Sequence, residues 1–209
     1  MEKYQLLEQL CLARGVAGQE ESVRQILREA VTDHVDSVET DALGNLIARK
    51  RPRGGEDNPL RVMIAAHMDE VGFMVVKAND NGGLKIRSVG GIDARLLPGK
   101  RVQIGEKAIP GVILQTPVHL QSNGNGVTDI EKLVVDTGGA NGVKPGDMVT
   151  FEPSYGQVGR LLKGKAFDDR VGCYVLTELL AAITRAKWWA SSPCKRRSAC
   201  AAHAWPPTP

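Results

Sequence analysis

Two clusters of His and Asp residues, far apart in the sequence, carry the side chains best suited to metal chemistry. His67-Met-Asp-Glu70 directly follows an apolar run, and Asp168-Asp169 precedes a segment with helical periodicity. Imidazole suits zinc or cobalt, and a carboxylate with two oxygens can bridge two divalent ions. Taken singly, His67 has a simpler explanation as a structural histidine, and the two aspartates as helix caps. Taken together, the two clusters favour a site for divalent metal ions.

The residues before His67 place it at the end of a strand. Residues 60–66 form a continuous apolar run, typical of a strand covered on both faces by helices. Open α/β sheets bind their ligands at the carboxyl ends of the strands. On an extended backbone His67 and Asp69 project to the same side. Asp69 could therefore fix the tautomer of a metal-binding His67, act as a ligand itself, or merely share the rim of the site.

Hydrophobic periodicity predicts the elements around this strand. Apolar residues at i, i+3, i+4, i+7 and i+8 predict an amphipathic helix over residues 20–32, and the leucines of residues 6–10 predict a shorter one. Residues 37–41 and 45–49 are typical of two strands around a turn. Helical periodicity returns over residues 171–180, with Asp168 and Asp169 at the N-cap.

Between the two clusters the pattern changes to β. Residues 71–162 alternate short Val- and Ile-rich runs with Gly, Asn and Pro turns, which predicts a small β-barrel or sandwich. The expected architecture is an α/β fold interrupted by an inserted β-barrel domain. Its predicted parts are a first catalytic segment (1–70), the β insertion (71–162), a second catalytic segment (163–184) and a tail (185–209).

Composition excludes several classes of protein. A chain that is 42% hydrophobic and 24% charged is typical of a globular protein. It lacks a secretory signal and any apolar run of membrane-spanning length, so we expect a cytoplasmic protein with no membrane partner. Four cysteines without CxxC spacing indicate reduced thiols. Residues 185–209 hold five basic residues and no acid, which leaves a net charge of −2 for residues 1–184 out of the total of +3. That charge is too weak to suggest a nucleic-acid partner.

Three motifs, in matching order and spacing, resemble the tetrahedral (TET) aminopeptidase family, which includes glutamyl aminopeptidases. They are Ala-His-Met-Asp-Glu-Val-Gly-Phe at 66–73, Gly-Gly-Ile-Asp-Ala-Arg at 90–95, and Gly-Lys-Ala-Phe-Asp-Asp-Arg-Val-Gly at 164–172. The resemblance covers residues 1 to about 184. It implies a zinc-aminopeptidase-like sheet covered by helices and interrupted by a small β-barrel. The activity that it implies is metal-dependent removal of N-terminal residues from peptides.

The resemblance also implies roles for individual residues. His67 would bind one of two divalent ions, zinc or cobalt, and Asp168 would bridge both. Asp69, the catalytic residue of the set, would orient His67. The β insertion would assemble subunits into a large homo-oligomer. His34 and His119 match no ligand position.

The chain departs from the family after residue 184. The family has a Glu-Glu pair on the next strand, one glutamate as general base and one as ligand, followed by an Asp and a His. This chain has no acid after Glu178, and residues 188–200 do not resemble a buried strand. Codons permitted for residues 193–202 encode Val-Gln-Glu-Glu-Val-Gly-Leu-Arg-Gly in another frame, and those for 187–192 encode Val-Val-Gly-Val-Phe-Ser. We therefore expect residues 185–209 to be a frameshift product that leaves an inactive, truncated enzyme.

Three alternatives stay open at this point. Residues 185–209 could form a genuine basic, Trp-containing tail for a partner or a membrane surface. The enzyme could be a related zinc carboxypeptidase, deacylase or glycosidase. The chain could also be a noncatalytic assembly module in which only the β domain acts.

Overall fold

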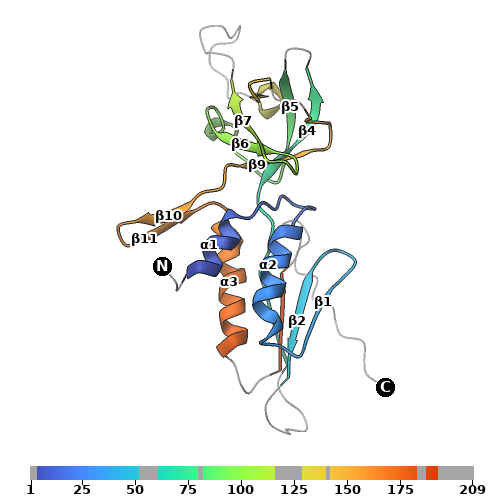
Figure 1. Cartoon of the computed structure of the whole chain (residues 1–209), viewed down its shortest axis with the longest axis vertical. Helices are drawn as coiled ribbons and strands as arrows, with labels where there is room; N and C mark the ends of the chain where they lie inside the picture. Colours follow the sequence, from blue (N-terminus) through green and yellow to red (C-terminus); the bar gives the residue numbers. More distant parts are fainter. Residues whose placement is uncertain are drawn as a thin grey trace.

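The computed structural model describes residues 4–51, 61–79, 82–115, 129–139 and 142–182, together with the backbone of 187–192. It divides into an α/β lobe and a β-barrel lobe, with a two-stranded hairpin projecting from the region between them (Figure 1). The chain enters the barrel directly after the His67 segment and returns to the α/β lobe just before Asp168. His119 and residues 193–209, including Cys194 and Cys200, lie outside the described residues.

Three helices build the α/β lobe: α1 (Gln5–Leu12), α2 (Glu21–Thr32) and α3 (Phe167–Ala182). Helix α2 buries Val23, Leu27 and Val31, spaced four residues apart, so that one apolar stripe faces the core. The helices predicted over 20–32 and around 6–10 are confirmed. None of the helices in the described part of the chain combines the length and apolar character needed to cross a membrane.

The sheet of this lobe has the strand order β1-β2-β12-β3. Its strands are β1 (Ser37–Thr40), β2 (Leu46–Lys50), β3 (Arg61–Ala65) and β12 (Lys187–Ser192). Strand β1 pairs antiparallel with β2, and β12 pairs antiparallel with β2 and parallel with β3. The strands predicted at 37–41, 45–49 and 60–66 are therefore present.

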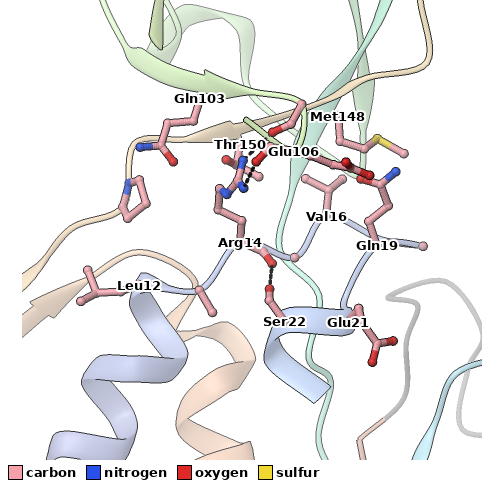
Figure 2. A pocket seen from close by; sticks show the side chains of 15 residues that line it. Leu12, Arg14, Val16, Gln19, Glu21, Ser22, Gln103, Glu106, Met148 and Thr150 are labelled. Carbon is pink, nitrogen blue, oxygen red and sulfur yellow. Dashed lines mark hydrogen bonds between the residues drawn. The ribbon is translucent and has the colours of Figure 1, made fainter. Parts of the chain in front are cut away.

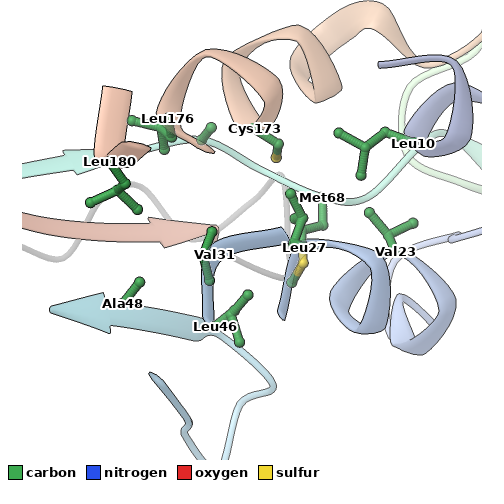
Figure 3. Close-up of a cluster of buried hydrophobic side chains, with 11 residues drawn as sticks. Leu10, Val23, Leu27, Val31, Leu46, Ala48, Met68, Cys173, Leu176 and Leu180 are labelled. Atoms are coloured by element: carbon green, nitrogen blue, oxygen red, sulfur yellow. The ribbon is translucent and has the colours of Figure 1, made fainter. Parts of the chain in front are cut away.

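A single hydrophobic core joins the helices to the sheet (Figure 3). It brings together side chains from α1, α2 and α3, from β2, and from the segment that follows β3. Its buried members are Leu10, Val23, Leu27, Val31, Leu46, Ala48, Ala66, Met68, Cys173, Leu176 and Leu180. Because α2 and α3 pack on the same cluster, the position of α3 is fixed relative to the end of β3.

Among the described residues, one expectation about the sheet is wrong, and one strand was not expected from the side chains. Strand β3 is not covered on both faces among the described residues, since its residues alternate between exposed and half-buried and Met63 is 50% exposed. The helices of the described chain contribute one core cluster, which covers only one side of the strand. The residues after Lys187, which did not resemble a strand, form β12 between β2 and β3. Strand pairing uses backbone groups, so the open edges of β2 and β3 can accept a segment whose side chains do not signal a strand.

The second lobe is a closed barrel with the strand order β4-β5-β8-β7-β6-β9. This confirms the predicted β-barrel. Its core contains apolar residues from all six strands, such as Phe73, Ile104 and Val149. The connections, as far as the structure describes them, contain the short 3₁₀ helices η2 (Ala94–Leu96) and η4 (Ile130–Lys132). The strands are β4 (Gly72–Ala78), β5 (Gly83–Val89), β6 (Arg101–Ile104), β7 (Ile109–Leu114), β8 (Val134–Asp136) and β9 (Met148–Phe151).

After the last barrel strand the chain forms the hairpin β10 (Tyr155–Val158) and β11 (Leu161–Gly164). Its base packs against the start of α3, where the rings of Tyr155 and Phe167 meet edge to face at 6.5 Å. The hairpin leads directly into Lys165 and Asp168, so it delivers the second cluster to the α/β lobe.

Candidate functional site

The segment Ala66–Glu70 continues the line of β3 and fixes His67 by anchoring its neighbours. Ala66 and Met68 are buried in the core of the α/β lobe. Since side chains alternate on extended backbone, His67 and Asp69 point to the opposite side. Oδ1 of Asp69 lies 3.0 Å from Nδ1 of His67, which confirms that the two side chains share one side.

Asp169 caps helix α3. Its Oδ1 accepts a hydrogen bond of 3.1 Å from the backbone N–H of Gly172, and Asp168 and Asp169 both have non-helical backbone angles. The regular helix therefore begins after Asp169, with the carboxylate satisfying one of the free N–H groups of the first turn. The N-cap predicted at this pair is confirmed for Asp169.

Asp168 points to the other cluster instead. Its Oδ1 lies 2.9 Å from Nε2 of His67, so the imidazole stands between two carboxylates, Asp69 on Nδ1 and Asp168 on Nε2. Asp69 is buried, the side chain of His67 is 18% exposed and that of Asp168 is 73% exposed. The structure thus brings together all three residues singled out from the sequence, with Asp69 on the buried side and Asp168 on the open side.

The donor set fits a divalent ion bound between His67 and Asp168. Two donor atoms that share one tetrahedral zinc, with bonds of roughly 2.1 Å, lie roughly 3.4 Å apart. The observed 2.9 Å between Nε2 and Oδ1 needs only a small displacement of the exposed Asp168 carboxylate. Oδ1 of Asp69 is buried and, among the described residues, makes no hydrogen bond of good geometry despite its closeness to Nδ1. The backbone carbonyl oxygen of Asp69 lies 3.3 Å from Nδ1 of His67, and a hydrogen bond from Nδ1–H to this oxygen favours the tautomer that leaves Nε2 for a metal ion.

No group of three or more His, Cys, Asp and Glu side chains arranged to hold a metal ion occurs in the part of the chain that the structure describes. His34 is exposed just after the end of α2 and belongs to no group of possible metal ligands among the described residues. Cys11 and Cys173 are buried, and neither forms a disulfide within the part of the chain that the structure describes. The thiol of Cys173 donates a hydrogen bond of 3.3 Å to the backbone carbonyl of His67 and supports the site from the core.

Behind the site lies a buried group of charges that sequence reasoning missed. Glu70 contacts both Lys165 and Arg170, and the Lys165 ammonium lies 2.6 Å and 2.8 Å from its two carboxylate oxygens. Burial lowers the pKa of Lys165, and the Glu70 carboxylate opposes that effect. Burial also raises the pKa of the nearby Cys11 thiol to about 11. One feature of the sequence could have indicated this group. Glu70, Lys165 and Arg170 lie within a few residues of His67 or Asp168, in motifs that also contain apolar residues.

A cavity of about 640 Å³ lies between the α1–α2 connection and the barrel, and is distinct from the His67 site (Figure 2). The Arg14 side chain crosses between the lobes here and donates to the backbone carbonyls of Gly105 and Glu106, at 2.6 Å and 2.8 Å. Ser22 in turn donates to the carbonyl of Arg14. These contacts join the lobes, while neither His67 nor Asp168 lines this cavity.

Comparison with known proteins agrees with this fold. The glutamyl aminopeptidase of Lactococcus lactis is 31% identical over 196 residues, covering 86% of this chain and 54% of that protein. A solved structure of the Pyrococcus horikoshii TET1 peptidase, described as assembling into a tetrahedron or a large octahedral shell, has a TM-score of 0.76. It is 32% identical and covers 90% of this chain and 59% of its own.

A third similar protein carries a different name. A structure described as an endoglucanase of Thermotoga maritima is 36% identical with a TM-score of 0.75, covering 89% of this chain and 58% of its own.

The chain spans about half the length of the curated relatives that it matches. The matching family is described as M42 glutamyl aminopeptidase, and the match covers residues 44–191, which include the His67 and Asp168 segments and reach into β12. The chain belongs to the M42 glutamyl aminopeptidase family.

Proposed function

We propose that the protein is a metal-dependent aminopeptidase whose site is built on His67, Asp69 and Asp168. The observation that carries the proposal is the 2.9 Å approach of His67 Nε2 to Asp168 Oδ1, between two segments separated in sequence by the whole barrel. Membership of the M42 family supports peptides as the substrates. His67 and Asp168 are the proposed ligands, with Asp168 shared between two ions, zinc or cobalt.

Each residue has a separate task in this proposal. Divalent ions at such a site supply Lewis acidity toward the scissile carbonyl and make the attacking water more acidic. Asp69 would orient His67, because its backbone carbonyl oxygen, 3.3 Å from Nδ1, can accept a hydrogen bond from Nδ1–H and so leave Nε2 as the electron-pair donor toward a metal ion on the side of Asp168. The exposed Asp168 carboxylate can present its two oxygens in different directions, as a bridging ligand must.

The 209-residue chain is proposed to hold only part of this machinery. It has no Asp or Glu after Glu178 to act as general base. Loss of a general base commonly costs roughly 10²–10⁴ in rate. We therefore expect no detectable aminopeptidase turnover from this chain, although its family is one of aminopeptidases.

Metal binding by the 209-residue chain tests the site. We expect Zn²⁺ or Co²⁺ to bind weakly in calorimetry, because two protein ligands leave a tetrahedral zinc incompletely coordinated. His67→Ala and Asp168→Ala should abolish this binding, whereas His34→Ala, at an exposed histidine outside the site, should leave it unchanged. Binding that survives His67→Ala would refute the proposed ligand set. A tight two-ion isotherm abolished by His67→Ala would refute the view that the site is incomplete.

Activity assays separate the remaining candidate functions. The substrates are aminoacyl-nitroanilides with added cobalt, and carboxymethylcellulose, because one similar structure is described as an endoglucanase. Chelator-sensitive hydrolysis of nitroanilides by this chain would contradict its proposed inactivity and leave the family assignment intact. Hydrolysis of cellulose would favour the glycosidase alternative.

Assembly and reading frame complete the proposal. We propose that the barrel mediates self-association, a suggestion supported by the TET1 structure of Pyrococcus horikoshii, which assembles into closed shells. We also propose that residues 185–209 arise from a frameshift. Strand β12 lies at the residues whose permitted codons can encode an apolar strand in the alternative frame. An immediate stop codon in that frame of the gene would contradict the frameshift.

A further inference from the structure

Three buried charged side chains bracket both proposed ligands. We propose that Glu70, Lys165 and Arg170 are positioning residues that set the separation between His67 and Asp168; this inference rests on the proposed metal site. Glu70 lies three residues after His67, and Lys165 and Arg170 lie on either side of Asp168. The barrel separates the two segments in sequence, so contacts made in the folded lobe must hold them together.

Arg170 connects the start of α3 to two other segments and is fully buried. Its Nε donates to the carbonyl of Met68, the residue after His67, at 3.1 Å. Its Nη1 donates to the carbonyls of Leu10 and Ala13 at the end of α1. The rigid, planar guanidinium therefore fixes the backbone of the His67 segment relative to the first turn of α3.

Lys165 and Glu70 make a second connection on the other side of Asp168. The Lys165 ammonium binds both carboxylate oxygens of Glu70 and the carbonyl of Ala13, the last at 2.9 Å. Oε1 of Glu70 also accepts from the backbone N–H of Gly15 at 3.0 Å and lies 3.3 Å from Nη2 of Arg170. Every charge in the group thus has buried partners, which is the condition under which buried ions are tolerated.

The arrangement assigns these residues more than a packing role. Simple filling of the core would not require two cations to converge on one carboxylate and on three backbone carbonyls. The contacts join segments on both sides of the His67–Asp168 pair and none of them uses the ligand atoms themselves. The group therefore holds the ligand segments through backbone carbonyls and Glu70, without contacting the proposed ligand atoms.

Hydrogen exchange of the 209-residue chain, read by mass spectrometry, tests the inference without any metal. In Arg170→Lys, amide exchange should rise together in residues 66–72 and 163–170, by roughly tenfold or more, as expected for the loss of hydrogen bonds to a charged donor. Exchange in the barrel strands β6 and β7 should not change. Glu70→Gln, which keeps the shape of the side chain, provides a second variant if Arg170→Lys does not fold.

Leu180→Ala is the matched control, since Leu180 is buried on the same helix, about three turns beyond Asp168, and its side chain takes no part in the charged group. Both variants are compared under conditions where circular dichroism shows that they are folded. Leu180→Ala should then increase amide exchange in α2 and at the end of α3, and should leave exchange in residues 66–72 unchanged. An Arg170→Lys pattern that matches that of Leu180→Ala would overturn the inference and leave only a general structural role.

Zn²⁺ affinity gives a second measurement. Changes to residues behind the ligands typically cost about 10–100-fold in metal affinity. We expect a loss of that size for Arg170→Met, a smaller loss for Arg170→Lys, and none for Leu180→Ala. Equal affinities in the parent chain and Arg170→Met would overturn the inference. A parent chain that takes up no Zn²⁺ would contradict the proposed metal site, and the exchange pattern alone would then decide the positioning role.

Discussion

Gly172 faces the carboxylate of Asp169, and replacing it with alanine should have opposite effects on stability in two backgrounds. A Cβ at position 172 would lie 2.4 Å from Oδ1 of Asp169 and 2.7 Å from its Cγ. The carboxylate accepts the hydrogen bond from the Gly172 N–H, so it must leave its capping position to admit the methyl group. The substitution therefore removes the cap of α3 at the residue next to Asp168.

The expected magnitude follows from three terms. Alanine is better than glycine inside a helix by about 1 kcal/mol. Loss of an Asp N-cap costs about 0.5–2 kcal/mol, and forcing a methyl group into a filled space costs about 1–3 kcal/mol. A carboxylate that moves aside relieves the clash but gives up the cap, so only one of the last two costs applies in full, and Gly172→Ala should destabilise the parent chain by up to about 2 kcal/mol. In an Asp169→Ala background the clash and the cap are both gone, and the same change should stabilise by about 1 kcal/mol.

Urea unfolding of the parent chain, the two single variants and the double variant, followed by circular dichroism, measures both effects and their coupling. Gly156→Ala is the control, because a Cβ at that position meets no atom within 4 Å. Stabilisation by Gly172→Ala in the parent chain would show that Asp169 does not occupy this space and would refute the capped arrangement.

Two further predictions concern a buried thiol and the junction of the lobes. Burial raises the pKa of Cys11 from 9.0 to about 11. Below pH 9 the folded chain therefore holds roughly 100-fold less Cys11 thiolate than the unfolded chain, and alkylation of Cys11 by iodoacetamide should be slower by that factor. The rate, followed by peptide mass spectrometry, should rise about tenfold per pH unit. Equal rates in the folded and unfolded chains would contradict the burial. Gly72→Ala would place a Cβ 2.6 Å from the backbone oxygen of Val149 and 2.6 Å from a methyl of Val16. It should lower stability by about 1–3 kcal/mol and Tm by roughly 2–12 °C in thermal unfolding; a Tm equal to that of Gly91→Ala, which has open space, would show that the junction can yield.

Local pattern was sufficient for the elements and for the identity of the ligand candidates. The four-residue spacing of Val23, Leu27 and Val31 predicts α2, because one helical face must be apolar to pack. Short runs between Gly and Pro turns predict the barrel strands, and Asp169 before an apolar periodicity predicts the N-cap. These features depend on interactions between residues close in sequence, so the type and spacing of the residues are enough to predict them.

The tertiary structure decided what long-range contacts determine. Only folding brings His67 to within 2.9 Å of Asp168, because the barrel separates them in the chain. Only packing shows that Glu70, Lys165 and Arg170 are buried, since charged residues in a motif otherwise suggest a solvated surface. The exposed face of β3 and the insertion of β12 beside it likewise depend on which helices and strand edges meet. The sequence alone determined which side chains could bind a metal ion, and the packing of α3 against the end of β3 determined that His67, Asp69 and Asp168 share one site.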